Sequence, residues 1–189
     1  MGQRIHIFGA SGVGTTTLGR FLSKRLDVPH LDTDDYFWAE SVIPYTQKRE
    51  VKERAELLES DLKRFPNWVL SGSLCGWGDF AIPLFEMVIF LWIPRELRMS
   101  RLHQREINRY GPEALLPGGW FHENHEAFMA WASTYDSAGA DMRSRVLHEQ
   151  WMNELPCKLI RLEEACSVEE LATRVEHELN LEQPLVDGI

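Results

Sequence analysis

The feature that most constrains this chain is a glycine-rich segment near its beginning, Gly9-Ala10-Ser11-Gly12-Val13-Gly14-Thr15-Thr16-Thr17. It follows a short apolar run at residues 5–8 and precedes residues 15–26, where leucines recur at helical spacing. Glycines let successive backbone N–H groups curl around an anion, and the positive end of the following helix faces the same anion. The segment therefore predicts a strand, a phosphate-binding loop and a helix in succession.

This segment matches the phosphate-loop pattern G-x-x-x-x-G-K-[ST] at every defined position except the lysine, which is Thr15 here. The hydroxyl of Thr16 is the expected Mg²⁺ contact. All nine residues from Gly9 to Thr17 are candidates for nucleotide binding. The alternative is a glycine-rich turn that binds no ligand. The combination of three glycines, three hydroxyl side chains and a strand–loop–helix context disfavours it.

The composition narrows the function further. The chain has 189 residues and a net charge of −9, which disfavours a dedicated nucleic-acid binder. Its longest apolar run, Met87 to Ile93, is far shorter than a membrane span. The three cysteines lack the C-x-x-C spacing of a zinc or redox site. We expect one cytoplasmic domain over residues 1–189 whose partner is a small molecule.

Strand-length apolar stretches alternate with helical patterns along the chain, which predicts a three-layer α/β domain with a parallel sheet. Expected strands are residues 5–8, 29–31, 68–71, 87–93 and 158–162. Expected helices are residues 15–26, 50–65, 95–110, 121–135, 142–155 and a last one after residue 167, with a loop at 111–119.

An acidic turn, Asp32-Thr33-Asp34-Asp35, follows the second expected strand. Ligands of parallel α/β sheets sit beyond the carboxyl ends of the strands, where this turn and the glycine loop both fall. The turn is therefore a candidate site. The alternative is a helix cap followed by acids of the first turn. Residues 36–38, which are aromatic, either wall an acceptor pocket or pack internally.

A second loop, residues 72–79, also follows a strand. Its glycines allow backbone N–H groups to approach an acceptor. Gly72, Ser73 and Asp79 are the candidate acceptor contacts, and a purely structural loop is the alternative. Cys75 lacks an identifiable base partner and is not expected to be a nucleophile.

Five arginines lie between residues 95 and 109, and helical spacing places them within an arc of about 120°. Arginine forks suit phosphate, although a solvated face is the alternative. Further along, His122 and His125 are three residues apart, which does not match the zincin spacing and favours helix packing.

The run of Gly9, Gly12, Gly14, Thr16, Thr17 and Gly19 resembles the loop and first helix of P-loop small-molecule and nucleotide kinases, especially shikimate kinase-like and adenylate kinase-like members. The resemblance implies a five-stranded parallel sheet, ATP as phosphoryl donor, and a helical lid at about residues 101–125. In the family an R-x-x-x-R pair of the lid contacts ATP, and Arg101 with Arg105 has this spacing. In shikimate kinase-like members one aspartate organises Mg²⁺ and its neighbour meets the acceptor hydroxyl. These roles would fall to Asp32 and Asp34.

Two departures from the family pattern matter. Thr15 replaces the lysine that bridges the β- and γ-phosphates, and the third strand ends without a carboxylate.

We expect an ATP-dependent enzyme that transfers a γ-phosphoryl group to a small molecule or nucleotide, with Asp34, Arg101 and Arg105 catalytic. The alternative is a regulatory or interaction protein that binds nucleotide without efficient transfer. A GTPase switch is disfavoured because no Asn-Lys-x-Asp occurs. The acceptor, the choice between ATP and GTP, and the oligomeric state stay open.

Overall fold

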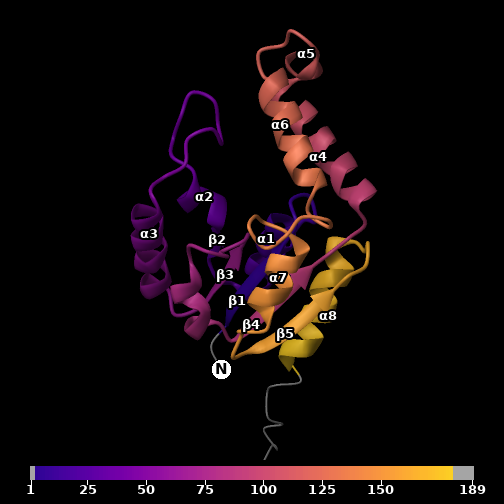
Figure 1. The fold of residues 1–189 in the computed structure, drawn as a ribbon. Helices are drawn as coiled ribbons and strands as arrows, with labels where there is room; N and C mark the ends of the chain where they lie inside the picture. Colours follow the sequence, from indigo (N-terminus) through magenta and orange to yellow (C-terminus); the bar gives the residue numbers. More distant parts are fainter. Residues whose placement is uncertain (1–2, 181–189) are drawn as a thin grey trace, which may run out of the picture.

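Five parallel strands form the centre of the computed structural model, which describes residues 3–180 (Figure 1). The strand order is β2-β3-β1-β4-β5, and every neighbouring pair is parallel. This confirms the predicted α/β fold and its five-stranded sheet. The strands are β1 Arg4–Gly9, β2 His30–Asp32, β3 Trp68–Ser71, β4 Met87–Leu91 and β5 Lys158–Leu162.

The central strands are buried on both faces. Along β1, Ile5 and Ile7 pack into one apolar cluster while Phe8 packs into the other, because successive side chains of a strand point to opposite faces. All five residues of β4 are buried. This explains why β4 reads as a continuous apolar run without alternation.

Helices cover both faces of the sheet. One cluster joins it to α1 Thr15–Leu26 and α8 Val168–Asn180, and Figure 1 shows these two helices on the same face. The other cluster joins it to the remaining core helices. Those are α2 Thr33–Phe37, α3 Val51–Arg64, the 3₁₀ helix Asp79–Leu84 and α7 Arg145–Met152. None of the helices within residues 3–180 is long and apolar enough to cross a membrane.

Three helices stand apart from the sheet, above the carboxyl ends of its strands (Figure 1). They are α4 Arg95–Tyr110, α5 Pro112–Leu115 and α6 His122–Ser133. Together they contain the segment predicted to form a lid. We call these three helices the lid from here on. The extent of a single domain over residues 1–189 stays a prediction, since its ends lie outside the described residues.

Several predicted boundaries were wrong. The helix expected at 142–155 spans only Arg145–Met152, because Ser144 caps it by accepting a hydrogen bond from Leu147 N at 3.0 Å. The expected loop at 111–119 contains α5, and the helix expected at 121–135 spans His122–Ser133. Sequence analysis predicted the start of α2 only as the capping alternative for the acidic turn, and it did not predict the 3₁₀ helix.

Strand β1 carries a fully buried histidine, His6. The His6 ring stacks on Phe8 and Phe85, with centroids 5.5 and 4.8 Å away. Its Nδ1 lies 3.2 Å from Leu70 O, while its Nε2 has no hydrogen-bond partner. Burial lowers the pKa of His6 from its ordinary 6.5 to about 3, so the ring is neutral in the folded protein.

We predict that His6→Phe makes the protein more resistant to acid. The lowered folded pKa means that His6 costs no stability above pH 6.5 and costs progressively more as the pH falls toward 3. At pH 5 that cost is about 2 kcal/mol, whereas at pH 7 phenylalanine changes stability by less than about 1.5 kcal/mol. Urea unfolding at both pH values measures this. The control is His177→Phe at an exposed position of α8. An unchanged pH dependence in His6→Phe would contradict the prediction.

Candidate functional site

The glycine loop between β1 and α1 presents backbone donors that lack partners. Gly12 and Gly14 adopt left-handed conformations, with φ of 85° and 104°. At Gly12 a Cβ would come within 2.8 Å of Arg98 O, so both the conformation and the space require glycine. The Val13 N–H donates to Ala10 O at 3.3 Å. Within residues 3–180, no acceptor bonds the N–H groups of Gly12, Gly14, Thr15 and Thr16. An anion can therefore bind there.

The loop is joined directly to the acidic turn. Thr16 Oγ1 donates to Asp32 Oδ2 at 2.8 Å, and the other Asp32 oxygen accepts from Asp34 N at 3.1 Å. Asp32 is thus the N-cap of α2, as the capping alternative predicted. The same carboxylate lies beside the phosphate loop. Capping and a role at the phosphate site are therefore compatible.

The Thr16–Asp32 pair fits Mg²⁺. Magnesium prefers oxygen ligands and is usually held by one or two carboxylates together with phosphate oxygens and water. Across the described residues 3–180, no cluster of three or more His, Cys, Asp or Glu side chains forms a metal cage. The Thr16 hydroxyl and the Asp32 carboxylate supply two oxygen ligands beside the free loop amides. The remaining ligands of a nucleotide-bound Mg²⁺ would be phosphate oxygens and water.

Asp34 lies near basic side chains from two other segments of the chain. Its carboxylate reaches solvent, but surrounding protein and nearby Asp32 raise its pKa above the ordinary value. Arg143, a hydrogen bond from Trp38, and Arg105 act in the opposite direction. Cations from two distant segments therefore converge on this aspartate.

Arg143 is a site residue that sequence analysis missed. It lies just before the N-cap of α7, where burial lowers its pKa while Asp34, Cys75 and Tyr135 raise it. Sequence analysis placed it in the expected helix at residues 142–155, and no motif marks it as a site residue. Cys75, in the same surroundings, has its pKa raised to about 11 by burial, so its thiol stays protonated and is a poor nucleophile near neutral pH.

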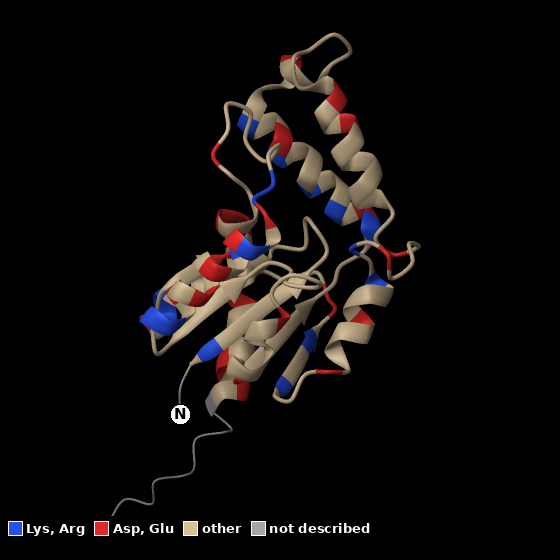
Figure 2. Cartoon of the chain, turned by 60° about the vertical axis from the view of Figure 1, so that its left-hand side comes forward, with Lys and Arg blue, Asp and Glu red and all other residues tan. Residues whose placement is uncertain are grey.

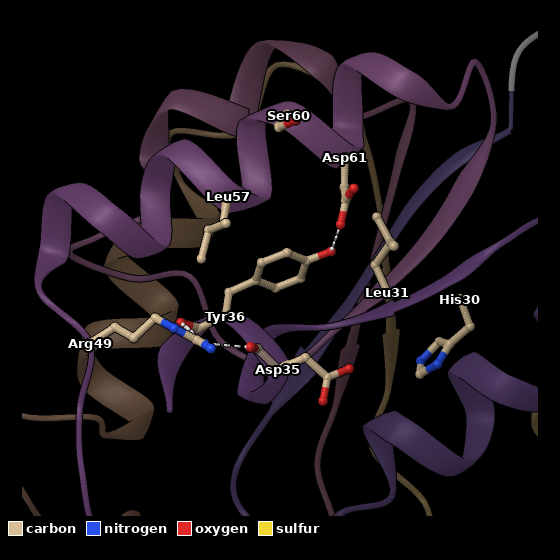
Figure 3. A pocket seen from close by; sticks show the side chains of 8 residues that line it. All are labelled: His30, Leu31, Asp35, Tyr36, Arg49, Leu57, Ser60 and Asp61. Atoms are coloured by element: carbon tan, nitrogen blue, oxygen red, sulfur yellow. Dashed lines mark hydrogen bonds between the residues drawn. The ribbon is translucent and has the colours of Figure 1, made fainter. Parts of the chain in front are cut away.

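Asp35 has different neighbours from Asp34. It lines a cavity of about 460 Å³ between β2, α2 and α3, shown in Figure 3. There Tyr36 donates its hydroxyl hydrogen bond to Asp61 at 2.8 Å. Burial and Asp32 raise the pKa of Asp35, while His30, Arg20 and Arg49 lower it. The two neighbouring acids of α2 therefore have different surroundings. Of the two, Asp34 is the one that lies near Arg143.

The arginines of α4 do not form one equivalent row. Arg101 Nη1 donates to Val13 O in the phosphate loop at 3.3 Å, and Arg105 acts on Asp34. Arg98 is fully buried, paired with Asp136 and 5.0 Å from the Tyr135 ring. Figure 2 shows basic segments along α4 and acidic segments on α2. The structure places Arg101 and Arg105 near the site, whereas Arg98 anchors the lid.

The loop at 72–79 is engaged by the protein itself. Gly72 N donates to Ile7 O at 2.9 Å, and buried Ser73 Oγ lies 3.1 Å from His148 Nε2. Asp79 Oδ1 accepts from Trp151 Nε1 at 2.8 Å. Burial lowers the pKa of His148 to about 3, so this histidine is neutral. These partners favour the structural alternative for the loop over direct acceptor contacts.

Comparison with known proteins agrees with this geometry. A family model described as AAA domain matches residues 5–128. This chain belongs to the AAA domain family. It is 52% identical to the uncharacterized protein YqaC of Bacillus subtilis (strain 168) over 175 residues, covering 93% of this chain and 96% of the relative.

Solved structures of P-loop kinases share the fold of this AAA domain protein. A shikimate kinase from Acinetobacter baumannii in complex with shikimate matches with a TM-score of 0.59 and 18% identity, over 97% of both chains. A sugar kinase from Janibacter sp. HTCC2649 matches with a TM-score of 0.54 and 14% identity, over 96% of both chains. The recognised P-loop kinase-like fold is therefore confirmed.

We predict that two substitutions at Asp32 separate its two roles. Asparagine also caps helices, so Asp32→Asn keeps stability within about 0.5 kcal/mol, while Asp32→Ala costs about 1 kcal/mol. Both variants lose a carboxylate beside the loop, so Mg²⁺-dependent nucleotide binding weakens at least about tenfold. Urea unfolding and titration calorimetry with and without Mg²⁺ measure the two effects. Undiminished Mg²⁺-dependent binding by Asp32→Asn would exclude the metal role.

Proposed function

We propose that this protein is an ATP- and Mg²⁺-dependent phosphotransferase that acts on a small anionic acceptor. The observation that carries the proposal is the Thr16–Asp32 contact of 2.8 Å beside unpaired loop amides, with Asp34 two residues further on. This arrangement supports a phosphate subsite and an acceptor subsite side by side. The P-loop kinase-like fold supports the same reading.

In this proposal the loop from Gly9 to Thr17 binds the nucleotide phosphates. The free N–H groups of Gly12, Gly14, Thr15 and Thr16 donate to phosphate oxygens. Thr16 and Asp32 hold Mg²⁺, which when bound neutralises charge on the phosphates. The loop follows β1, and Asp32 is the last residue of β2, so the sheet places both groups at one edge.

Asp34 orients the acceptor hydroxyl and accepts its proton as the phosphoryl group is transferred. Its raised pKa suits that task, because a base with a pKa closer to the working pH accepts a proton more readily. Arg105 and Arg143 carry positive charge toward the same carboxylate. Electrostatic stabilisation by such preorganised cations is the main requirement of phosphoryl transfer.

A second arginine supports an anionic acceptor. The Arg54 side chain is buried, with only 8% of its surface exposed, and its Cζ lies 4.2 Å from the Phe37 ring and 5.5 Å from the Trp77 ring. Within the described residues its guanidinium has no hydrogen-bond acceptor, and its buried Nε is unpartnered. Burial lowers the pKa of Arg54, while Glu50 acts in the opposite direction. A carboxylate or phosphate of the acceptor, bound by Arg54 and Arg143, would offset more of this desolvation.

The missing loop lysine requires another cation. Arg101 is the nearest candidate on the lid, because its guanidinium already contacts the loop at Val13 O. Arg20, on α1, instead acts on His30 and Asp35, away from the loop. We therefore assign to Arg101 the charge that a lysine at position 15 would supply.

We predict that Arg101→Ala lowers kcat at least about 100-fold, as expected for removal of a principal transition-state donor. Thr15→Lys alone preserves or tightens ATP binding, since the loop already matches the motif at its other positions. In the double variant, lysine restores part of the lost turnover. Steady-state kinetics and calorimetry measure these effects. Near-normal kcat in Arg101→Ala, or loss of ATP binding in Thr15→Lys, would contradict the assignment.

Thr15 also favours a second candidate function. Without the lysine, the protein binds nucleotide but transfers phosphate too slowly to be an enzyme, and acts as a nucleotide-gated regulatory module. This candidate predicts tight Mg²⁺-ATP binding with no turnover. It differs from the kinase proposal in turnover, not in binding.

The decisive experiment is a phosphoryl-transfer assay across hydroxylated carboxylates, sugars and nucleotides, followed by ³¹P NMR. We predict transfer to an anionic acceptor. Asp34→Asn should lower kcat at least about 100-fold because the proton acceptor is lost, while ATP affinity changes less than about threefold. The matched control is Asp35→Asn, which lines the cavity behind α2 and leaves transfer intact. Tight ATP binding without turnover on any acceptor would favour the regulatory module.

A further inference from the structure

The two long helices of the lid bury a polar pair between them. Glu106 on α4 and His125 on α6 are each only 4% exposed, and Glu106 Oε2 lies 3.3 Å from His125 Nδ1. Within residues 3–180, no other hydrogen bond or ion pair reaches the Glu106 carboxylate. Burying a carboxylate is costly, and an apolar pair would pack between these helices without that cost. The pair therefore calls for an explanation other than packing.

A second imidazole ring completes a row of three side chains. His103 of α4 is exposed, and its Nδ1 lies 3.3 Å from His125 Nε2. The two ring centroids are 5.3 Å apart. Because His103 and Glu106 are three positions apart on α4, they share the face of that helix toward α6, and the two helices lie side by side in Figure 1. The row runs from buried Glu106 through His125 to His103 at the surface.

The spacing of the two rings matches that of two ligands on one metal ion. Hydrogen bonds from a nitrogen donor are usually about 2.7–3.2 Å long, so 3.3 Å between the two nitrogens is long for a hydrogen bond. Two imidazole nitrogens that each bind a tetrahedral Zn²⁺ at about 2.0–2.1 Å lie about 3.3–3.4 Å apart, and their ring centroids lie roughly 5 Å apart. The observed separations of 3.3 and 5.3 Å agree with this arrangement.

Glu106 occupies the position of a carboxylate that orients a metal-binding histidine. Such histidines almost always donate their other ring N–H to a carboxylate, a carbonyl or water, which fixes the tautomer. With its Nδ1–H directed at Glu106, His125 presents the lone pair of Nε2 toward His103. His103 presents its own Nδ1 lone pair when its proton lies on Nε2. Its exposure lets solvent exchange that proton, so binding needs no net proton release.

We propose that His103 and His125 form a Zn²⁺ site that joins α4 to α6, with Glu106 as the positioning residue for His125. Water fills the remaining coordination positions, because no group of three or more His, Cys, Asp or Glu side chains within residues 3–180 could hold a metal. Imidazole nitrogens suit Zn²⁺, whereas Mg²⁺ prefers oxygen ligands. The site is therefore chemically distinct from the Thr16–Asp32 pair, and it does not depend on the proposed kinase activity.

The ion would brace the helix that carries the candidate arginines. His103 lies between Arg101 and Arg105 along α4, so a bond from His103 through Zn²⁺ to α6 fixes α4 within the lid. Two protein ligands make the binding reversible, so the stiffness of the lid follows the available Zn²⁺. Sequence analysis compared His125 with His122, but His122 Nδ1 lies 2.8 Å from Leu115 O. The partner of His125 is instead 22 positions away on another helix.

Titration calorimetry of the full chain with Zn²⁺, in excess Mg²⁺ and without nucleotide, tests the site. We expect saturable binding by the wild type that weakens at least about 100-fold in His103→Gln, which removes a ligand at an exposed position and leaves the core intact. The matched control, His122→Gln on α6, should bind Zn²⁺ like the wild type. Absence of saturable binding by the wild type, or equal binding by His103→Gln, would overturn the proposal.

NMR of ¹⁵N-labelled histidine rings tests the geometry and the positioning role. Zn²⁺ should shift Nδ1 of His103 and Nε2 of His125, and coordination by the opposite nitrogens would contradict the site. Without metal, His125 should carry its proton on Nδ1 in the wild type and lose this preference in Glu106→Leu, which keeps bulk but removes the acceptor. Zn²⁺ affinity should fall at least about tenfold in that variant. Unchanged affinity and tautomer would remove Glu106 from the site.

Hydrogen exchange measured by mass spectrometry tests whether the ion joins the two helices. Saturating Zn²⁺ should slow exchange at least about tenfold in both α4 and α6 of the wild type, because it stabilises only the state in which they are packed together. Exchange in α8 and in His103→Gln should not change. Slower exchange in one helix alone would overturn the cross-link. None of these readouts involves phosphoryl transfer, so failure of the Zn²⁺ site and failure of the kinase proposal are distinguishable.

Discussion

The hydrogen bond from Thr16 to Asp32 is the contact on which the candidate site depends. It joins the loop after β1 to the turn after β2, two segments that lie at the same edge of the sheet but are separated there by β3. Because the second oxygen of Asp32 caps α2, the same carboxylate sets the direction of that helix. The phosphate loop and the acceptor acid are therefore placed by one side chain.

The position of α2 then separates two environments. Gly72, with a φ of 105°, leaves no room for a Cβ against Thr33, so α2 lies directly over the end of β3. Asp34 lies near Arg143, while Asp35 lines the cavity of Figure 3. A helix of five residues thus divides acids that are adjacent in sequence between two sides.

Buried polar contacts join α7 to the 72–79 loop and to the residues that follow α6. His148 contacts both Ser73 Oγ and the Tyr135 hydroxyl, at 3.1 and 2.8 Å. Tyr135 lies against Arg98, which pairs with Asp136 at the base of the lid. Because His148 stays neutral in this buried setting, the network joins α7, the 72–79 loop and the lid without adding an uncompensated charge.

The sequence by itself determined those features that depend only on residues close together along the chain. The phosphate loop, the parallel α/β rhythm and the acidic turn after β2 all follow from local spacing and turn chemistry. Only the tertiary structure decided that Arg143 meets Asp34 and that Arg98 is buried. Helical spacing specifies which side of a helix a residue occupies, but packing decides what lies opposite that side. The contact of His103 with His125 depends on the same packing, across 22 positions of the chain.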